Sequence, residues 1–190
     1  IDVKWAGDRT KSMDRLSLLR RASEAAPDDL EFANNLGLWA RDIGEARKRG
    51  RRTEGLAELF ELSITGYNRA VKVAPQDVRV LNDTALLLVH HLEREWDRSR
   101  KLLDDGIRLG EKQIQDVPEG DAKRNLDEAL GDCYENLALW HMKHSKDLDA
   151  AEQAARASME HYPAQRRPGA RRYLGLIERH PLGSQCFLPM

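Results

Sequence analysis

The chain has 190 residues, of which 33% are charged and 6% aromatic, with 31 basic and 32 acidic side chains. This length suits one domain that buries a sizeable core, and a net charge of −1 gives no overall attraction to nucleic acid or to an anionic membrane. No apolar run approaches the roughly 20 residues that span a bilayer.

The cysteine content and the first residue bear on cellular context. Cys133 and Cys186 do not make a disulfide framework, which favours a reducing, cytoplasmic compartment. The sequence begins with Ile1 rather than Met, so we expect a fragment or a processed chain. A missing signal peptide therefore carries little information about location.

Hydrophobic spacing predicts an all-α chain. Apolar residues recur at intervals of three and four almost throughout, and no segment alternates with period two. The pattern predicts eight helices, near 12–26, 29–44, 54–74, 77–94, 97–116, 121–145, 147–161 and 167–179.

Capping residues and prolines mark the predicted helix ends. Ser12 and Asp77 are expected N-caps, and Asp28 or Asp29 is expected to cap the second helix. Proline cannot continue a helix interior, so each proline ends one helix or opens the next. Four prolines punctuate the chain in this way: Pro27, Pro75, Pro118 and Pro163.

A short motif recurs within four of the predicted helices. Each copy centres on Gly or Ala, which lets a neighbouring helix approach more closely than a larger side chain would. The copies are Asn35-Leu36-Gly37-Leu38, Asp83-Thr84-Ala85-Leu86, Asn136-Leu137-Ala138-Leu139 and Tyr173-Leu174-Gly175-Leu176.

Four stretches share a helical-hairpin pattern: Ala33-x2-Leu36-Gly37-x2-Ala40, Leu81-x2-Thr84-Ala85-x2-Leu88, Asp127-x2-Leu130-Gly131-x2-Tyr134 and Ala151-x3-Ala155 followed by Pro163. With this pattern the chain resembles tetratricopeptide (TPR) repeats, which are helix–turn–helix units of nominally 34 residues. The repeats here are longer, and in the third unit both Leu130-Gly131 and Leu137-Ala138 fit the signature, so its register stays open. The usual tryptophan position holds Ala33, Leu81 and Asp127.

The resemblance implies a right-handed α-solenoid of stacked antiparallel helical hairpins over residues 12–180. Residues 1–11 are then an N-terminal extension or cap, and residues 181–190 form a C-terminal tail. The helix at 167–179 is expected to cap the array. A sharper hypothesis for the tail is that Phe187 and Leu188 dock on the array or on a neighbouring molecule.

The resemblance also implies a concave groove that binds a partner peptide or helix. Asparagine offers both a donor and an acceptor, which suits holding an extended backbone. Arg41 and Arg79 are expected to select acidic features of the partner. Glu31 and Leu38 stand where a clamp for chaperone tails needs basic residues, so that subtype is not expected. The predicted groove residues are Asn34, Asn35, Leu38, Arg41, Arg79, Asn82, Asp83, Leu86 and His90.

Two further clusters have a simpler interpretation. His90-His91 with Glu93, and His141 with His144, supply too few ligands for a metal site, so we expect surface histidines and no metal. The basic run from Arg47 to Arg52 lacks interleaved aromatic residues and is interpreted as a solvated loop between helices.

Catalytic motifs are missing from the sequence: we find no phosphate-binding glycine loop, dinucleotide fingerprint, zinc-protease motif or nucleophile elbow. The sequence therefore predicts a protein–protein interaction scaffold that is not an enzyme and needs no cofactor. One alternative is a structural spacer or self-association domain, which leaves a homo-oligomer open. Another is phosphate or nucleic-acid contact through 47–52, although neither a nucleic-acid nor a membrane partner is expected.

Overall fold

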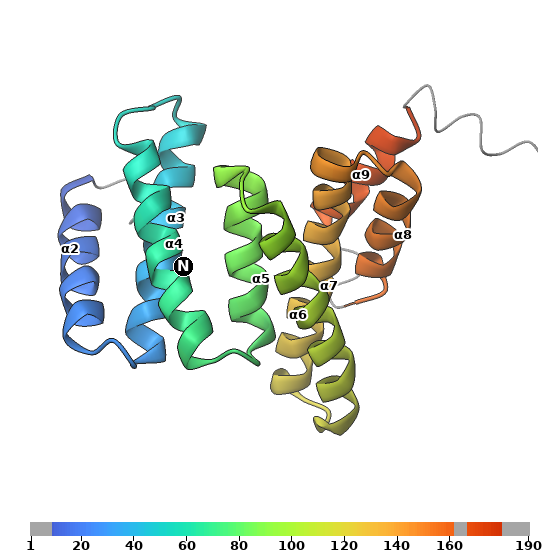
Figure 1. The fold of residues 1–190 in the computed structure, drawn as a ribbon, viewed down its shortest axis with the longest axis horizontal. Coiled ribbons are helices and arrows are strands. Elements are labelled where there is room, and N and C mark those ends of the chain that lie inside the picture. Colours follow the sequence, from blue (N-terminus) through green and yellow to red (C-terminus); the bar gives the residue numbers. More distant parts are fainter. Residues whose placement is uncertain (1–8, 162–166, 180–190) are drawn as a thin grey trace, which may run out of the picture.

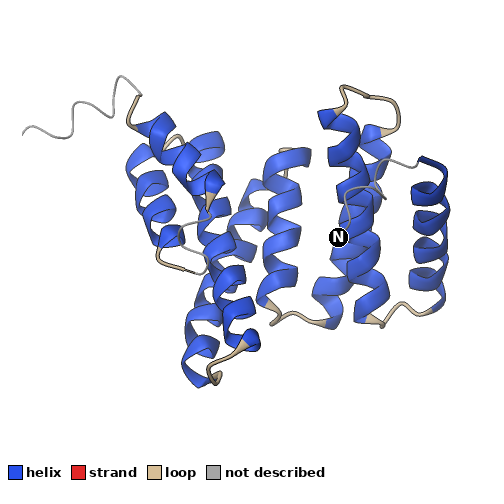
Figure 2. Cartoon of the chain, turned by 180° about the vertical axis from the view of Figure 1, so that it is seen from behind, coloured by secondary structure: helices blue, strands red, loops and turns tan. Residues whose placement is uncertain are grey.

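The structure is a computed structural model that describes residues 9–161 and 167–179, with the side chains described from residue 13 onward. These residues form eight α-helices and two π-helical turns, and they contain no strand (Figure 2). The prediction of an all-α chain with about eight helices is confirmed. The elements are α2 (Arg9–Ala25), α3 (Leu30–Arg49), α4 (Leu56–Val73), α5 (Val78–Leu87), η1 (Leu88–Leu92), α6 (Trp96–Asp116), α7 (Asp121–Trp140), η2 (His141–Ser145), α8 (Leu148–Met159) and α9 (Pro168–Ile177).

Successive helices pack against one another in chain order, and α7 also contacts α5 and α9. In Figure 1 the helices stand side by side in a row, from α2 at one end to α8 and α9 at the other. The handedness of a solenoid and the division at residues 12 and 180 stay predictions. Among the described residues, no helix is long and apolar enough to cross a membrane.

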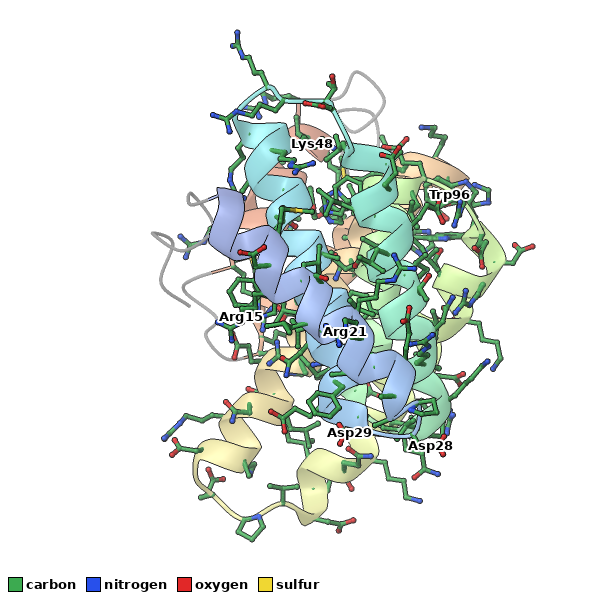
Figure 3. All side chains as sticks on the ribbon, turned by 90° about the vertical axis from the view of Figure 1, so that its left-hand side faces the viewer. Arg15, Arg21, Asp28, Asp29, Lys48 and Trp96 are labelled. Carbon is green, nitrogen blue, oxygen red and sulfur yellow. The ribbon has the colours of Figure 1, made fainter. Side chains whose placement is uncertain are left out.

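Aspartate side chains fix the starts of three helices. Asp29 accepts a hydrogen bond from the Phe32 amide at 2.9 Å, and Asp77 caps α5 in the same way through Val80, at 3.1 Å. Asp147 caps α8. Each carboxylate satisfies an amide that the first helical turn leaves without a partner. Figure 3 shows Asp29 and Lys48 at opposite ends of α3.

Several predicted boundaries were wrong. Ser12 lies inside α2 and does not cap it, because that helix begins at Arg9. The basic run is not entirely a loop: α3 continues to Arg49, where Gly50 ends it. The fourth and sixth predicted helices each finish in a π turn, and each turn closes on a left-handed residue, Glu93 or Lys146. Pro163 and the tail lie outside the described residues.

Small residues allow α3 and α4 to approach closely. A Cβ at Gly66 would lie 2.5 Å from the Gly37 amide nitrogen, and one at Gly37 would lie 2.6 Å from the Tyr67 ring. The Ser63 hydroxyl donates to the Gly37 carbonyl at 2.7 Å, and the Ser158 hydroxyl donates to the Gly131 carbonyl at 2.8 Å between α8 and α7. Gly131, and not Ala138, therefore takes in α7 the place that Gly37 takes in α3.

The main hydrophobic core runs from α4 to α9, and a smaller cluster joins α2, α3 and α4. Tyr67, Leu103 and Cys133 are fully buried within the main core. Burial of this apolar surface is the dominant stabilising contribution to such a fold. It also leaves one polar face, shared by α3, α5 and α7, on which the candidate site lies.

Candidate functional site

Charged and amide side chains from α3, α5 and α7 converge with the residue that precedes α9. On α5 and on α7 the polar residues recur at a spacing of three or four, which keeps those of each helix on one face. Arg41 joins them from α3. We call this set the polar network: Arg41, Arg79, Asn82, Asp83, Asp132, Asn136 and Arg167.

Arg79 joins α5 to α7. Its guanidinium donates to Asp132 Oδ2 at 3.0 Å, to the Asn125 carbonyl at 3.2 Å and to Glu128 Oε2 at 3.4 Å. These bonds use the two terminal nitrogens, and 39% of the side chain remains exposed. Arg79 is thus held in a fixed orientation at the surface, which is the arrangement that suits an arginine for binding a carboxylate.

Arg167 holds Asp132 from the other side. Its guanidinium donates to Asp132 Oδ1 at 2.5 Å and to the Glu128 carbonyl at 2.9 Å, and only 3% of the side chain is exposed. Burial raises the pKa of Asp132, while Arg167 and Arg79 oppose that rise. The two arginines thus share one carboxylate, Arg167 inside the protein and Arg79 at its surface.

Asn82 and Asn136 form the inner part of the polar network. Asn136 Nδ2 donates to Asn82 Oδ1 at 2.9 Å, and the two residues are 3% and 1% exposed. On the neighbouring position of α5, Asp83 lies 3.4 Å from the Arg41 guanidinium. Burial raises the pKa of Asp83, against the opposing effect of Arg41 and Arg79. Carboxyl groups whose pKa is perturbed by burial and by specific charged partners are frequent at functional sites.

A buried hydroxyl and a half-buried imidazole border the network without joining its ion pairs. The Tyr67 hydroxyl is buried and has no hydrogen-bond partner among the described residues. Its burial raises the pKa of this phenol far above the ordinary value, and Asp83 adds to the effect. Burial lowers the pKa of His90 to about 4, so this imidazole is neutral at pH 7.

A surface hollow of about 480 Å³ opens beside Arg79, where the start of α5 meets the end of α6 and the first half of α7. Val78 and Ala129 are buried in its wall, and its polar side chains are those of Gln76, Asp77, Arg79, Gln113 and Asn125. We call it the Arg79 hollow. It is lined by Gln76, Asp77, Val78, Arg79, Gln113, Asn125, Leu126 and Ala129.

The structure brings together four of the nine residues predicted for a groove: Arg41, Arg79, Asn82 and Asp83. Both arginines are engaged by carboxylates of the chain itself. The other five are half-buried on α3, on α5 or in η1, and the buried Asn34 Oδ1 has no hydrogen-bond partner among the described residues. These five are Asn34, Asn35, Leu38, Leu86 and His90.

Sequence reasoning missed the α7 part of the site. Glu128, Asp132 and Asn136 follow one another at intervals of four, which places them on one helical face. Asn136 also opens one of the recurring motifs, in the position that Asp83 takes in another. This shared motif position is a sequence signal that points to Asn136 as a site residue. No sequence signal points to Arg167, because its partners are more than thirty positions away in sequence.

The histidine clusters and the basic run do not form a network like that around Arg79 among the described residues. His144 stacks on Trp96 with ring centroids 5.0 Å apart, and His141 lies within 3.1 Å of Arg100. The part of the chain that the structure describes has no group of three or more His, Cys, Asp or Glu side chains placed to hold a metal ion. In the basic run, Lys48 lies exposed at the end of α3 (Figure 3).

Comparison with known proteins gives one match. The model of the family described as ureidoglycolate lyase matches residues 123–190, which include most of α7, η2, α8 and α9. No curated protein and no solved structure matches the chain. The matched segment contributes Glu128, Asp132 and Asn136 to the site, whereas Arg79 and Asn82 precede it.

This match overturns the functional expectations drawn from the sequence. The resemblance to TPR repeats is contradicted, because the family that matches is a different one. The interaction scaffold and its two alternatives, a spacer and a phosphate-contacting loop, are contradicted for the same reason. The expectation that the chain is not an enzyme is also contradicted, since the matching family is one of lyases.

Proposed function

We propose that this chain is a lyase that cleaves a carbon–nitrogen bond in a small ureido-substituted hydroxy acid, and that the substrate lies in the Arg79 hollow. One observation carries the proposal: Glu128 and Asp132, two carboxylates of the matched segment, hold an exposed arginine at the rim of this hollow. Ureidoglycolate, the compound in the family's description, is the substrate we assign.

The chemistry of that compound defines what a site must supply. A single carbon carries a carboxylate, a hydroxyl and a ureido nitrogen. When the hydroxyl loses its proton, the oxygen electron pair forms a carbonyl and the C–N bond breaks. The nitrogen keeps the bonding pair and takes up a proton, so the products are glyoxylate and urea. The site therefore needs a cation for the carboxylate and a group that moves one proton.

Arg79 and Glu128 are the residues we assign to these tasks. Arg79 binds the carboxylate, since a guanidinium has five N–H donors and its present bonds leave part of it exposed. Glu128, whose side chain is 41% exposed, takes the hydroxyl proton and returns it to the departing nitrogen. Asp132 and Arg167 are positioning residues that fix Arg79 from behind.

The test is release of glyoxylate and urea from ureidoglycolate by the purified chain. We expect release above the rate in buffer alone, and Glu128→Gln should lower it by about 100-fold or more, the usual contribution of a general acid–base residue. Glu54→Gln removes an exposed carboxylate on the α3–α4 loop and is the matched control. A parent chain that releases neither product faster than buffer overturns the proposal.

A further inference from the structure

The Arg79 hollow carries an amide side chain in a fixed orientation, which the proton transfer does not use. Gln113, near the end of α6, donates from Nε2 to the Gln76 carbonyl at 3.2 Å. This bond ties the carboxamide to the loop before α5. Because Nε2 makes this bond, Oε1 of Gln113 remains an acceptor for a ligand in the hollow that Gln113 lines.

The remaining polar groups of the hollow complement this acceptor. Asn125 is exposed at the start of α7, and its backbone carbonyl, not its amide, receives the bond from Arg79. Asp77 already uses its carboxylate to cap α5 through the Val80 amide. Among the side chains that line the hollow, the carboxamides of Gln76, Gln113 and Asn125 and the guanidinium of Arg79 are therefore available to a ligand. The wall behind them includes Val78 and Ala129.

The donors and acceptor of a ureido group are complementary to those of the carboxamides. It presents N–H donors on both nitrogens and one carbonyl acceptor, whereas an acylamino group of the same shape has a methyl in place of the terminal NH₂. An acceptor aimed at that position gains a hydrogen bond from the ureido group, and it is left unpaired by the acyl group. Gln113 Oε1 supplies such an acceptor, and the Asn125 amide supplies both a donor and an acceptor.

We propose that Gln113 and Asn125 make the Arg79 hollow selective for ureido acids over acylamino acids. The inference rests on the proposed function for the location of the substrate. It extends that function by assigning specificity to α6 and to the start of α7, while Arg79 supplies affinity for any small carboxylate.

The test compares binding of N-carbamoylglycine and N-acetylglycine by calorimetry. The two acids differ by one NH₂ against one CH₃, and neither carries the hydroxyl that cleavage requires. We expect the parent chain to prefer N-carbamoylglycine by about 5- to 10-fold, the effect of one hydrogen bond. Gln113→Leu should remove the preference while keeping the affinity for N-acetylglycine, and Arg79→Ala should weaken both ligands alike.

One control and one further test variant make the outcome decisive. Gln115→Leu changes an exposed glutamine of the same helix outside the hollow, and it should keep the preference. Asn125→Leu is a second variant for the case in which Gln113→Leu does not fold. Equal affinities in the parent chain, no binding of either acid, or an undiminished preference in folded Gln113→Leu and Asn125→Leu each overturn the inference.

The binding test can be distinguished from the test of lyase activity because neither N-carbamoylglycine nor N-acetylglycine undergoes the cleavage reaction. A chain that prefers N-carbamoylglycine but releases no glyoxylate from ureidoglycolate keeps this inference and loses the lyase activity. A chain that cleaves ureidoglycolate without the preference keeps the activity and loses this inference.

Discussion

Asn136 on α7 donates a hydrogen bond to Asn82 on α5 at 2.9 Å, inside a region where both side chains are almost fully buried. This amide pair links the segment that matches a lyase family to a helix that precedes it. Burying an amide costs free energy unless the amide makes a hydrogen bond. The bond between the two asparagines therefore reduces the cost of burying each of them. The pair therefore stabilises the α5–α7 contact, and it also restricts how the two helices fit together.

Asn136→Ala should lower the free energy of unfolding by about 1–3 kcal/mol, because it leaves the buried Asn82 oxygen without its donor. In the double variant Asn82→Ala/Asn136→Ala, the loss should be smaller than the sum of the two single losses. Urea denaturation measures all three. Asn125→Ala, at an exposed position, is the control and should stay within about 0.5 kcal/mol of the parent. Strictly additive losses would show that the two amides are not coupled.

Gly66→Ala should be strongly destabilising, by about 3 kcal/mol or more, since its Cβ would lie 2.5 Å from the Gly37 nitrogen and 2.8 Å from the Ala33 carbonyl oxygen. Backbone atoms of α3 cannot move aside as a flexible side chain can. Gly175→Ala is the matched change in α9, where a Cβ meets one arginine nitrogen at 3.7 Å. It should raise stability by about 0.5–1 kcal/mol through helix propensity. Thermal melting of the two variants should shift in opposite directions.

Tyr67→Phe should stabilise the chain by about 1 kcal/mol, because it removes a buried hydroxyl that has no hydrogen-bond partner among the described residues. The ring, which packs against Gly37, is retained. Tyr134→Phe is the comparison: its hydroxyl donates to Glu111 at 2.6 Å, so its loss should be neutral or slightly destabilising. Denaturant midpoints measure both. A clear loss of stability in Tyr67→Phe would mean that this hydroxyl has a partner in solution.

His90 should make the chain less stable as the pH falls from about 6.5 to about 4. Burial lowers its pKa to about 4 in the folded chain, and the adjacent His91 and Lys143 act in the same direction. The unfolded chain, with an ordinary histidine pKa near 6.5, binds the proton first in this range. Protonation therefore favours unfolding, and the contribution of His90 to stability is present above pH 6.5 and lost toward pH 4.

The measurement is the free energy of unfolding against pH for the parent and His90→Gln. The difference between the two curves should change by up to about 3 kcal/mol across this window. His144→Gln, at an exposed position on η2, is the matched control. Parallel curves for the parent and His90→Gln would contradict the prediction.

The helices were predictable because their signals are local. Hydrophobic spacing located all eight, and Asp29 and Asp77 cap α3 and α5 as expected. The end of α3 is predicted at residue 44 but lies at Arg49, and Arg47 in this last turn donates to the Glu54 carbonyl across the following loop. The π turns have no local signature of this kind, so the sequence predicts one uninterrupted helix for each of the two segments that contain them.

The site was predictable only in part. Arg41, Arg79, Asn82 and Asp83 follow from the polar face of two helices, but the sequence does not reveal that the arginines are paired within the chain. Asp132 on α7 contacts Arg79 on α5 and Arg167 before α9, at separations of 53 and 35 positions, which spacing alone cannot determine. The functional prediction is overturned by the family match to residues 123–190, which a search for contiguous catalytic motifs does not detect.

The two π turns determine where the chain can lose one residue without disturbing the polar network. Each widened turn closes over five residues and holds one more residue than an ordinary turn. Lys143 of η2 bonds the Val89 carbonyl in η1 at 3.1 Å, so the two turns also brace each other. Both follow the polar network along their helices, at the ends of α5 and α7. One residue can therefore be deleted from either turn without rotating Asn82 or Asn136 out of register, and the same deletion upstream would turn each of them away from its partner.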